Sequence, residues 1–307
     1  MLGRDFISIA DYTPDEVRLL LDAAVKLKAR GRPELLTGRT LAMIFEKPSL
    51  RTRVSFQVAM QDLGGHAIYL SQEEVGLGVR EPVKDIARVL SRYVDVIAAR
   101  TYLHATVTEL ADYAEVPVIN ALSDEEHPCQ ALADLLTIHE RFGGVKGVRI
   151  AYIGDGNNVL RSLLIGGAML GAHIAMATPE GYEPPGTVLE AAAVAGHESG
   201  GSIRLLREPE AAVDEADVVY TDVWTSMGQD SERFRRQRDF ARFRVDLDLM
   251  RKASPRAVIM HDLPAHRGEE IEDEAIESEQ SVVFDQAENR LHAQRALLAM
   301  LLAQPDL

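Results

Sequence analysis

The segment Ser49-Leu50-Arg51-Thr52-Arg53 places hydroxyl and guanidinium groups where they could bind an anion. It follows an apolar run at 41–45 with the length of a strand, and it precedes a stretch with helical apolar spacing. Ser49 favours the N-cap position, so the first amides of that helix would face an incoming anion. Arg51 adds a planar fork for phosphate oxygens. The segment predicts a phosphate site. A capped surface helix with solvated arginines is the alternative interpretation.

Two further donors lie where they could polarise a carbonyl group. Arg100 follows a predicted strand at 94–99, and His127 precedes Pro128 at a predicted helix start. Hydrogen bonds from such groups stabilise charge that develops on an oxygen. Taken alone, His127 is as well explained as a helix-capping residue, and Cys129 as a packed core residue.

A glycine-containing turn at 154–158 follows another apolar run at 148–153. Val159 occupies the third glycine position of Gly-x-Gly-x-x-Gly, so the turn lacks the dinucleotide fingerprint and disfavours a nicotinamide-dependent dehydrogenase. Asn157 and Asn158 instead offer donors and acceptors that suit a zwitterion.

The segment from Asp222 to Gly228 follows a predicted strand at 218–220. A carboxylate at Asp222 could hold an α-ammonium group, and a loop containing Ser226 and Met227 could close over a methylene chain. Without these neighbours, Asp222 is more often a turn residue. The segment is therefore a candidate amino-acid site.

Apolar runs of strand length alternate with helical patterns along the chain. This alternation predicts an α/β fold with two domains, each a doubly wound unit with a parallel sheet. The glycine cluster at 143–147 marks the expected boundary between domain 1, residues 1–143, and domain 2, residues 144–286. The C-terminal helix at 287–307 returns to the first domain. Ligands of such sheets bind beyond the carboxyl ends of the strands, where these segments lie.

The 307 residues carry a formal net charge of −15, which disfavours nucleic acid or an anionic membrane surface as the main partner. A single cysteine excludes an intrachain disulfide. The N-terminal residues lack the apolar core and cleavage site of a signal peptide, and no apolar run has the length of a membrane span. A cytoplasmic protein is expected.

Together the motifs resemble the aspartate/ornithine carbamoyltransferase family. The Ser-x-Arg-Thr-Arg segment resembles the family's carbamoyl-phosphate loop, and His127-Pro128-Cys129-Gln130 resembles its His-Pro-x-Gln motif. In the family the histidine and an arginine matching Arg100 contact the carbamoyl oxygen. The resemblance implies a carbamoyl-phosphate site made of Ser49, Leu50, Arg51, Thr52, Arg100, His127, Gln130, Leu263 and Arg290.

The segment at 222–228 resembles the ornithine loop of the ornithine-specific members, which the aspartate-specific relatives lack. Ornithine would bind through Asn158, Asp222, Ser226 and Met227. Carbamoyl phosphate would bind first, and domain closure would exclude water and align the amine. No metal or other cofactor is expected, because arginines can stabilise the developing charge. The family also implies a homotrimer or a multiple of trimers.

Two positions depart from the family pattern. Asp262 stands where the family usually has the cysteine of His-Cys-Leu-Pro, near the reacting amine, and is assigned a catalytic role. A carboxylate there would stabilise the ammonium form of an amine whose ordinary pKa is about 10, yet it could also accept a proton as general base. Gly76 stands where the family often has a glutamine that reaches a neighbouring subunit; Arg80 or the loop backbone could replace that contact.

The predicted reaction moves the carbamoyl group of carbamoyl phosphate to the side-chain amine of L-ornithine, giving L-citrulline and phosphate. One alternative is a carbamoyltransferase for another amine, such as putrescine, against which Asp222 argues. The other is a catalytically weakened binding or regulatory homologue, which the replacement at Asp262 favours.

Overall fold

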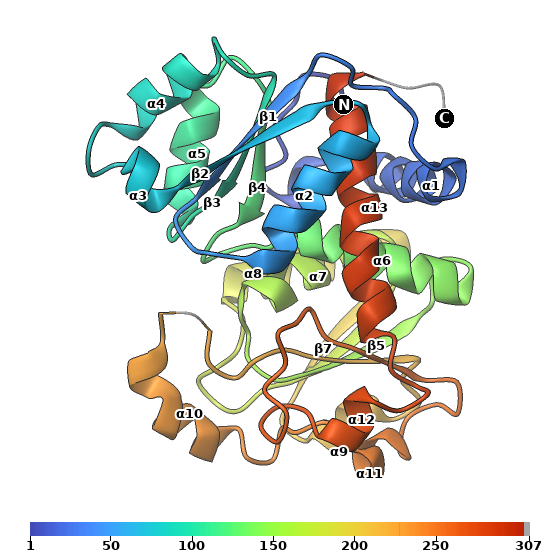
Figure 1. The fold of residues 1–307 in the computed structure, drawn as a ribbon. Helices are drawn as coiled ribbons and strands as arrows, with labels where there is room; N and C mark the ends of the chain where they lie inside the picture. The colour runs from blue at the N-terminus through green and yellow to red at the C-terminus, as the bar shows by residue number, and fades with distance from the viewer. Residues whose placement is uncertain (227, 304–307) are drawn as a thin grey trace. The chain divides into compact units, whose positions relative to one another are not determined.

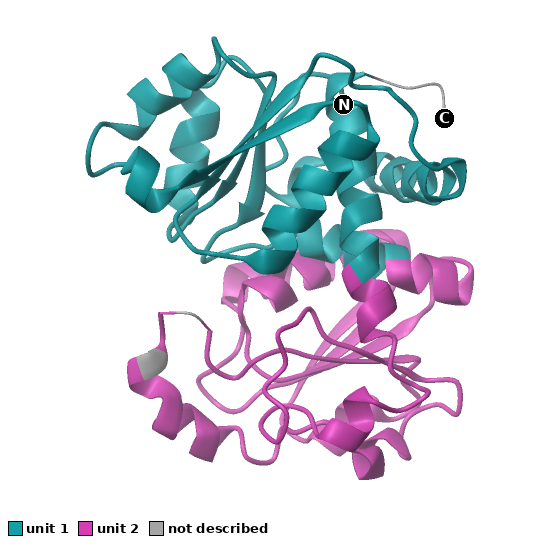
Figure 2. Cartoon of the chain, in the orientation of Figure 1, with its two compact units in different colours: residues 1–136, 288–307 teal, residues 137–287 magenta. Residues whose placement is uncertain are grey.

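The computed structural model describes residues 1–226 and 228–303. The chain forms two compact units, unit 1 with residues 1–136 and 288–307 and unit 2 with residues 137–287 (Figure 2). We expected the domain boundaries at 143/144 and 286/287. The chain passes from one compact unit to the other at 136/137, inside a helix, and returns at 287/288. Met227 and residues 304–307, which our site and domain predictions include, lie outside the described residues.

Unit 1 is built on a four-stranded parallel sheet in the order β2-β1-β3-β4. The strands are β1 (Thr40–Phe45), β2 (His66–Ser71), β3 (Val96–Arg100) and β4 (Val118–Leu122). The other elements are η1 (Ile9–Asp11), α1 (Pro14–Arg30), α2 (Leu50–Asp62), α3 (Gln72–Val75), α4 (Val83–Leu90) and α5 (His104–Tyr113). Helices α4 and α5 lie on one side of the sheet and α1 and α2 on the other (Figure 1).

Alternation along the strands fills both faces of this sheet. The side that meets α4 and α5 carries every second residue of β1 and β3, namely Ala42, Ile44, Ile97 and Ala99. The residues between them are also fully buried, so the strands have no solvent face. Strands buried on both faces consist of continuous apolar residues, and these runs allowed the strands to be predicted from the sequence.

Unit 2 has a five-stranded parallel sheet in the order β7-β6-β5-β8-β9. Its strands are β5 (Arg149–Ile153), β6 (His173–Ala177), β7 (Ser202–Leu206), β8 (Val218–Thr221) and β9 (Val258–Met260). Its helices include α7 (Asn158–Met169), α8 (Gly186–Ser199), α9 (Pro209–Val213), α10 (Arg233–Asp239), α11 (Leu247–Met250) and α12 (Asp273–Ile276), with the 3-10 turn η2 (Asp230–Glu232). Two helices run from one unit into the other: α6 (Pro128–Phe142) and α13 (Val283–Leu302).

The predicted α/β class with two parallel sheets is confirmed, and the strands predicted at 41–45, 94–99, 148–153 and 218–220 are present within two residues of their expected bounds. The short helices α3, α9, α10, α11 and α12 were not predicted, because four to seven residues hold too little periodicity. No described helix combines the length and apolar character needed to span a membrane.

Helix α13 is anchored in unit 1 by a buried charge cluster. The Asp62 carboxylate, at the end of α2, lies 2.9 Å from Arg32 Nε and 3.9 Å from Arg295 Nη1. Arg295 is 3% exposed and also donates to the carbonyl of Gly31, the C-cap of α1. Burial lowers the pKa of Arg295, and the charge of Asp62 opposes this shift. The cluster therefore joins α13 to the ends of α1 and α2.

Replacing Arg295 with methionine should lower the free energy of unfolding by about 3 kcal/mol, because Asp62 keeps a buried charge with only the more exposed Arg32 beside it. Urea denaturation followed by circular dichroism measures this. Arg18→Met is the matched control, since Arg18 pairs with an Asp15 side chain that is 93% exposed. Its effect should stay below about 0.5 kcal/mol. Equal losses in the two variants would contradict the anchor.

Candidate active site

The phosphate loop, residues 49–53, is closed by a capping interaction. Ser49 Oγ accepts a hydrogen bond from the Thr52 amide at 3.3 Å and donates to Thr52 Oγ1 at 3.0 Å. The amides of Leu50 and Arg51 lie in the first turn of α2, at the positive end of the helix dipole. Arg51 is half-buried, whereas the Arg53 guanidinium lies 3.8 Å from the centre of the Tyr69 ring. The predicted N-cap is confirmed, and anion binding stays a prediction.

Arg290 brings α13 to this loop. Its Nη2 donates to Thr52 Oγ1 at 2.5 Å, across 238 residues of sequence. Arg290 is 3% exposed and Thr52 is fully buried. Ser49, Thr52 and Arg290, all predicted site residues, thus form one hydrogen-bonded chain.

Arg100 ends β3 and pairs in register with Phe45, the last residue of β1, so it lies at the same sheet edge as the phosphate loop. Lys47 adds a cation that the sequence analysis did not assign to the site. Burial lowers the pKa of Lys47, and so does the nearby charge of Arg100. Its position two residues before Ser49 was the available signal. This edge is cationic in a chain of net charge −15, as an anion site requires.

His127 and Gln130 lie at the start of α6, where they are 2% and 0% exposed. Gln130 Nε2 donates to Asp134 Oδ1 at 2.8 Å, which orients the amide. In the described part of the chain, Gln130 Oε1 is buried and has no hydrogen-bond partner. A buried acceptor left unpaired suits the N–H groups of a carbamoyl ligand.

In unit 2, the side chain of Asn157 has a structural role rather than a free hydrogen-bonding group for a ligand. Its Oδ1 accepts from the amides of Val159 and Leu160 at 3.0 and 3.1 Å, which makes it the N-cap of α7. Its Nδ2 donates to Asp222 Oδ2 at 2.6 Å. Asn157 therefore positions the predicted ornithine anchor, while Asn158 begins α7 and is half-buried.

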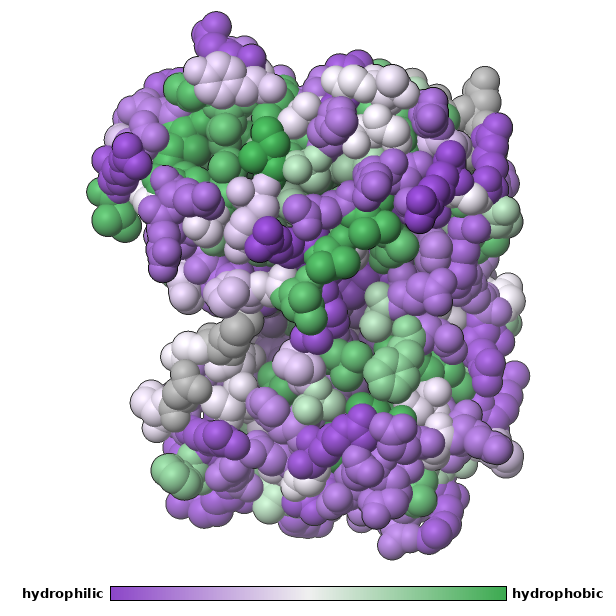
Figure 3. Space-filling model, in the orientation of Figure 1, coloured by the Kyte–Doolittle hydropathy of each residue, from purple (hydrophilic) through white to green (hydrophobic). Residues whose placement is uncertain are grey.

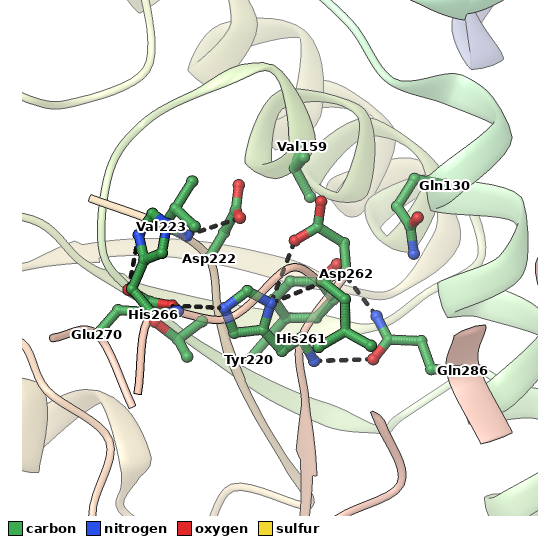
Figure 4. A network of polar contacts seen from close by, with 12 residues as sticks. Gln130, Val159, Tyr220, Asp222, Val223, His261, Asp262, His266, Glu270 and Gln286 are labelled. Carbon is green, nitrogen blue, oxygen red and sulfur yellow. Dashed lines mark hydrogen bonds and ion pairs between the residues drawn. The ribbon is translucent and has the colours of Figure 1, made fainter. Parts of the chain in front are cut away.

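The carboxyl groups of Asp222 and Asp262 lie together (Figure 4). One oxygen of each and a ring nitrogen of His261 all lie within 4.8 Å of one another. Asp222 is 5% exposed and accepts a hydrogen bond from the Val223 amide at 2.6 Å. Burial raises the pKa of Asp222 well above its ordinary value, and the neighbouring Asp262 raises it further. The two carboxyl groups therefore favour holding a proton between them when no cation is bound.

His261 connects this carboxyl pair to Glu270. His261 Nε2 lies 3.0 Å from Glu270 Oε1, and Nδ1 lies 3.4 Å from Asp262 Oδ1. Burial lowers the pKa of His261, but hydrogen bonds with Asp262 and Glu270 outweigh it and raise the pKa to about 10. The Leu263 amide, however, donates to Nδ1 at 2.9 Å, so that nitrogen must carry a lone pair. This contact places the ring proton of His261 on Nε2, facing Glu270.

Leu263 and Ser226 complete the predicted set in unit 2. Leu263 adopts φ +59, a left-handed conformation that non-glycine residues rarely take, and its hydrogen bond to His261 holds it there. Ser226 is half-buried, and its amide donates to Gln229 Oε1 at 3.1 Å. The structure thus brings Asp222 and Asp262 together and places Ser226 in the segment after β8.

Two groups of described side chains have the spacing of metal ligands: Asp222, His261 and Asp262, and His266, Glu269 and Glu270. In each group, at least one atom that could bind a metal already accepts a hydrogen bond from the protein. The Leu263 amide bonds to His261 Nδ1, and Arg233 Nη2 donates to Glu269 Oε1 at 2.7 Å. These internal contacts account for both clusters, and we assign no metal to them.

The chain belongs to the aspartate/ornithine carbamoyltransferase family. Two family models match it: the carbamoyl-P binding domain over residues 4–140 and the Asp/Orn binding domain over residues 146–301. A relative from Pyrococcus abyssi, named ornithine carbamoyltransferase, is 57% identical over 98% of this chain and 96% of its own length. A Pyrococcus furiosus relative named ornithine carbamoyltransferase, anabolic, is 55% identical over 98% of this chain and 97% of its own length.

Solved structures agree with these matches. The ornithine carbamoyltransferase structure from Pyrococcus furiosus has a TM-score of 0.96 at 54% identity and covers 99% of each chain. That from Thermus thermophilus has a TM-score of 0.90 at 48% identity, covering 98% of this chain and 100% of that one. The expected family is therefore confirmed.

The carboxyl pair predicts a pH-dependent stability. A carboxyl group whose pKa is raised on folding stabilises the fold at low pH and loses that contribution as the pH rises above its ordinary value of 3.8. Asp262→Asn removes the neighbouring carboxyl group that helps to raise the pKa of Asp222. The variant should therefore lose less stability than the wild type between about pH 5 and about pH 8. Thermal unfolding at both pH values measures this difference.

Asp248→Asn is the control, because the Asp248 side chain is 80% exposed and its replacement should have the same small effect at both pH values. The melting temperature of Asp262→Asn minus that of the wild type should therefore increase at the higher pH. If this difference stays constant or decreases, the two carboxyl groups do not share a proton.

Proposed function

We propose that this protein is an ornithine carbamoyltransferase, which transfers the carbamoyl group of carbamoyl phosphate to the side-chain amine of L-ornithine and releases L-citrulline and phosphate. The names of relatives that are 55–57% identical over nearly the whole chain support this. The observation that carries the choice of acceptor is the buried pair Asp222 and Asp262. Two carboxyl groups select a cationic amine and repel the dicarboxylate that an aspartate-specific enzyme must bind.

Unit 1 binds carbamoyl phosphate in this proposal. The phosphate receives hydrogen bonds from the first amides of α2 and from Arg51, with Ser49 and Arg290 completing its shell. Arg100 and His127 donate to the carbamoyl oxygen, and the unpaired Oε1 of Gln130 accepts from the carbamoyl amide.

Unit 2 binds ornithine in this proposal. Asp222 holds the α-ammonium group, and Asn158 and Ser226 contribute hydrogen bonds. Asn157 and the Val223 amide hold Asp222 in place at 2.6 Å each. Putrescine carries an ammonium group at the matching position, so the site distinguishes ornithine by its α-carboxylate, which Asn158 and Ser226 can hydrogen-bond and which putrescine lacks.

The chemistry follows from proton balance. The ornithine side chain arrives as an ammonium ion, which Asp262 stabilises, and it releases one proton to solvent to leave a neutral amine. Its lone pair forms the C–N bond at the carbamoyl carbon, and Thr52, Arg100 and His127 stabilise the oxygen of the tetrahedral species. The C–O bond to phosphate then breaks, and the departing phosphate takes the second proton from nitrogen. Citrulline and phosphate remain.

The direction and assembly are part of the proposal. We place the reaction in arginine synthesis in the cytoplasm, in line with the Pyrococcus furiosus relative named anabolic. We also infer a homotrimer or a multiple of trimers. Hydrophobic side chains gather on the surface of unit 1 over the region of β2 and α4 (Figure 3). Exposed apolar residues on these two elements include Ile68 of β2 and Val89 of α4, each 47% exposed. A patch of this kind favours contact with another subunit.

Citrulline formation from carbamoyl phosphate should be observed with L-ornithine, and rates with putrescine, N-acetylornithine and L-aspartate should be at least about 100-fold lower, because each lacks a group that the proposed site pairs or adds one that it repels. A colorimetric citrulline assay with saturating carbamoyl phosphate measures this. Tight carbamoyl-phosphate binding without turnover of ornithine would leave a binding or regulatory homologue as the better assignment.

Replacing Asp262 with the family's cysteine should raise kcat and move the acid limb of the pH–rate profile to lower pH by about one unit or more, because a nearby carboxylate stabilises the ammonium form of the acceptor. Steady-state rates across the pH range measure the shift. Asp262→Asn removes the charge without adding a thiol, so it should move the limb in the same direction and also raise kcat; a lower kcat in this variant would mean that Asp262 accepts the proton of the amine. An unchanged profile in both variants would mean that Asp262 does not face the amine.

A further inference from the structure

Arg236 is a buried arginine on α10 that the proposed chemistry does not use. Its side chain is 8% exposed, whereas those of Arg233, Arg235 and Arg238 on the same helix are 55%, 63% and 77% exposed. Removing a guanidinium group from water is unfavourable unless its N–H groups find partners. Its burial therefore indicates a specific set of contacts.

Those contacts join separate segments of unit 2. Arg236 Nη1 donates to Asp155 Oδ2 and to the Trp224 carbonyl, both at 2.9 Å. Its Nε donates to Glu232 Oε2 at 2.9 Å, and its guanidinium carbon lies 5.0 Å from the centre of the Tyr182 ring. Burial raises the pKa of Asp155, and the charge of Arg236 opposes that shift. Each member of the pair thus makes the burial of the other possible.

The two main partners belong to the two loops that carry the proposed ornithine residues. Asp155 lies in the turn at 154–158, which leads into Asn158, and Trp224 lies in the segment at 222–226. The pairing of β5 with β8 ends at Ile153 and Thr221, so the strand ladder does not reach either loop. Beyond that point the loops are joined by the Asn157–Asp222 hydrogen bond and by the bridge through Arg236.

We propose that Arg236 is a positioning residue for the acceptor amino acid: with Asp155, it fixes the separation between the turn at 154–158 and the segment at 222–226. This inference rests on the proposed function, because it concerns how that site presents ornithine. Arg236 acts through the Trp224 carbonyl and does not touch the reacting atoms. Since Trp224 stands between Asp222 and Ser226, a displaced carbonyl would move both proposed ligands together.

Packing makes this bridge stiff. The Trp224 side chain is 2% exposed and stacks on Phe240 with ring centres 6.0 Å apart. On the other loop, a Cβ atom added at Gly156 would lie 2.3 Å from the Pro184 nitrogen, so the turn is tightly packed against the neighbouring chain. A bridge between two well-packed loops sets one distance rather than a range of distances.

Arg236→Gln should raise KM for ornithine on the order of 10- to 100-fold, the size expected when binding groups are misplaced. KM for carbamoyl phosphate should change less than about twofold, since unit 1 is untouched. Arg236→Lys keeps the charge but loses the planar fork, so its KM for ornithine should be intermediate. Arg235→Gln, at an exposed position of the same helix, is the matched control and should leave both values unchanged.

Asp155→Asn tests the other end of the bridge. Its effect on KM for ornithine and that of Arg236→Gln should be strongly non-additive in the double variant, because both changes break one contact. Should Arg236→Gln not fold, Arg236→Lys and Asp155→Asn carry the same comparison.

A second measurement does not depend on turnover. Trp224 is the only tryptophan of the sequence, so its fluorescence reports on the segment directly. Acrylamide should quench it more readily in folded Arg236→Gln than in the wild type or Arg235→Gln. Unchanged quenching with an unchanged KM for ornithine, or an equal rise in both KM values, would overturn the positioning role. A wild-type protein that forms no citrulline would instead contradict the proposed function, and quenching would still report whether Arg236 holds the segment.

Discussion

The central strands of both sheets are parallel and buried on both faces, and this constraint decides where polar chemistry can occur. A strand such as β1, in which five of six residues are fully buried, has no face on which a charged side chain could meet a ligand. The polar groups therefore follow the strands. The phosphate loop comes after β1, Arg100 ends β3, the turn at 154–158 comes after β5, and Asp222 comes after β8. Within each sheet the parallel ladder aligns these ends, so groups far apart in sequence reach the same edge of that sheet.

The sequence predicted well whatever depends on neighbours along the chain. Ser49 caps the helix because its side chain meets an amide only three residues away. The strands were found because burial on both faces leaves continuous apolar runs. Long-range pairings were not predictable on physical grounds: nothing near Thr52 points to a hydrogen bond with Arg290, which only the resemblance to a family placed at this site. Arg235 and Arg236 are neighbours of identical type, and only the tertiary fold buries one and exposes the other.

Asp262 gives the acceptor side an electrostatic character that a thiol would not give. On the proposed function, a second carboxyl group beside Asp222 strengthens the attraction for a cationic acceptor, and it also stabilises the charged form of the amine that must become neutral to react. Recognition and reactivity thus make opposite demands on one residue. The links through His261 to Glu270 and from Asn157 to Asp222 hold this pair in place without adding a cationic side chain among the contacts described.

Because α13 closes the phosphate loop of unit 1, the order of synthesis matters for this chain. Thr52 leaves the ribosome early, whereas Arg290 is added 238 residues later, after the whole of unit 2 has been made. Unit 1 therefore lacks one side chain of its proposed anion site while the second sheet is translated and folds. Ribosome-bound chains that stop before α13 would contain the strands and helices of unit 1 but would lack the guanidinium that finishes its ligand site. On the proposed function, competence to bind carbamoyl phosphate is thus acquired only after α13 has been made.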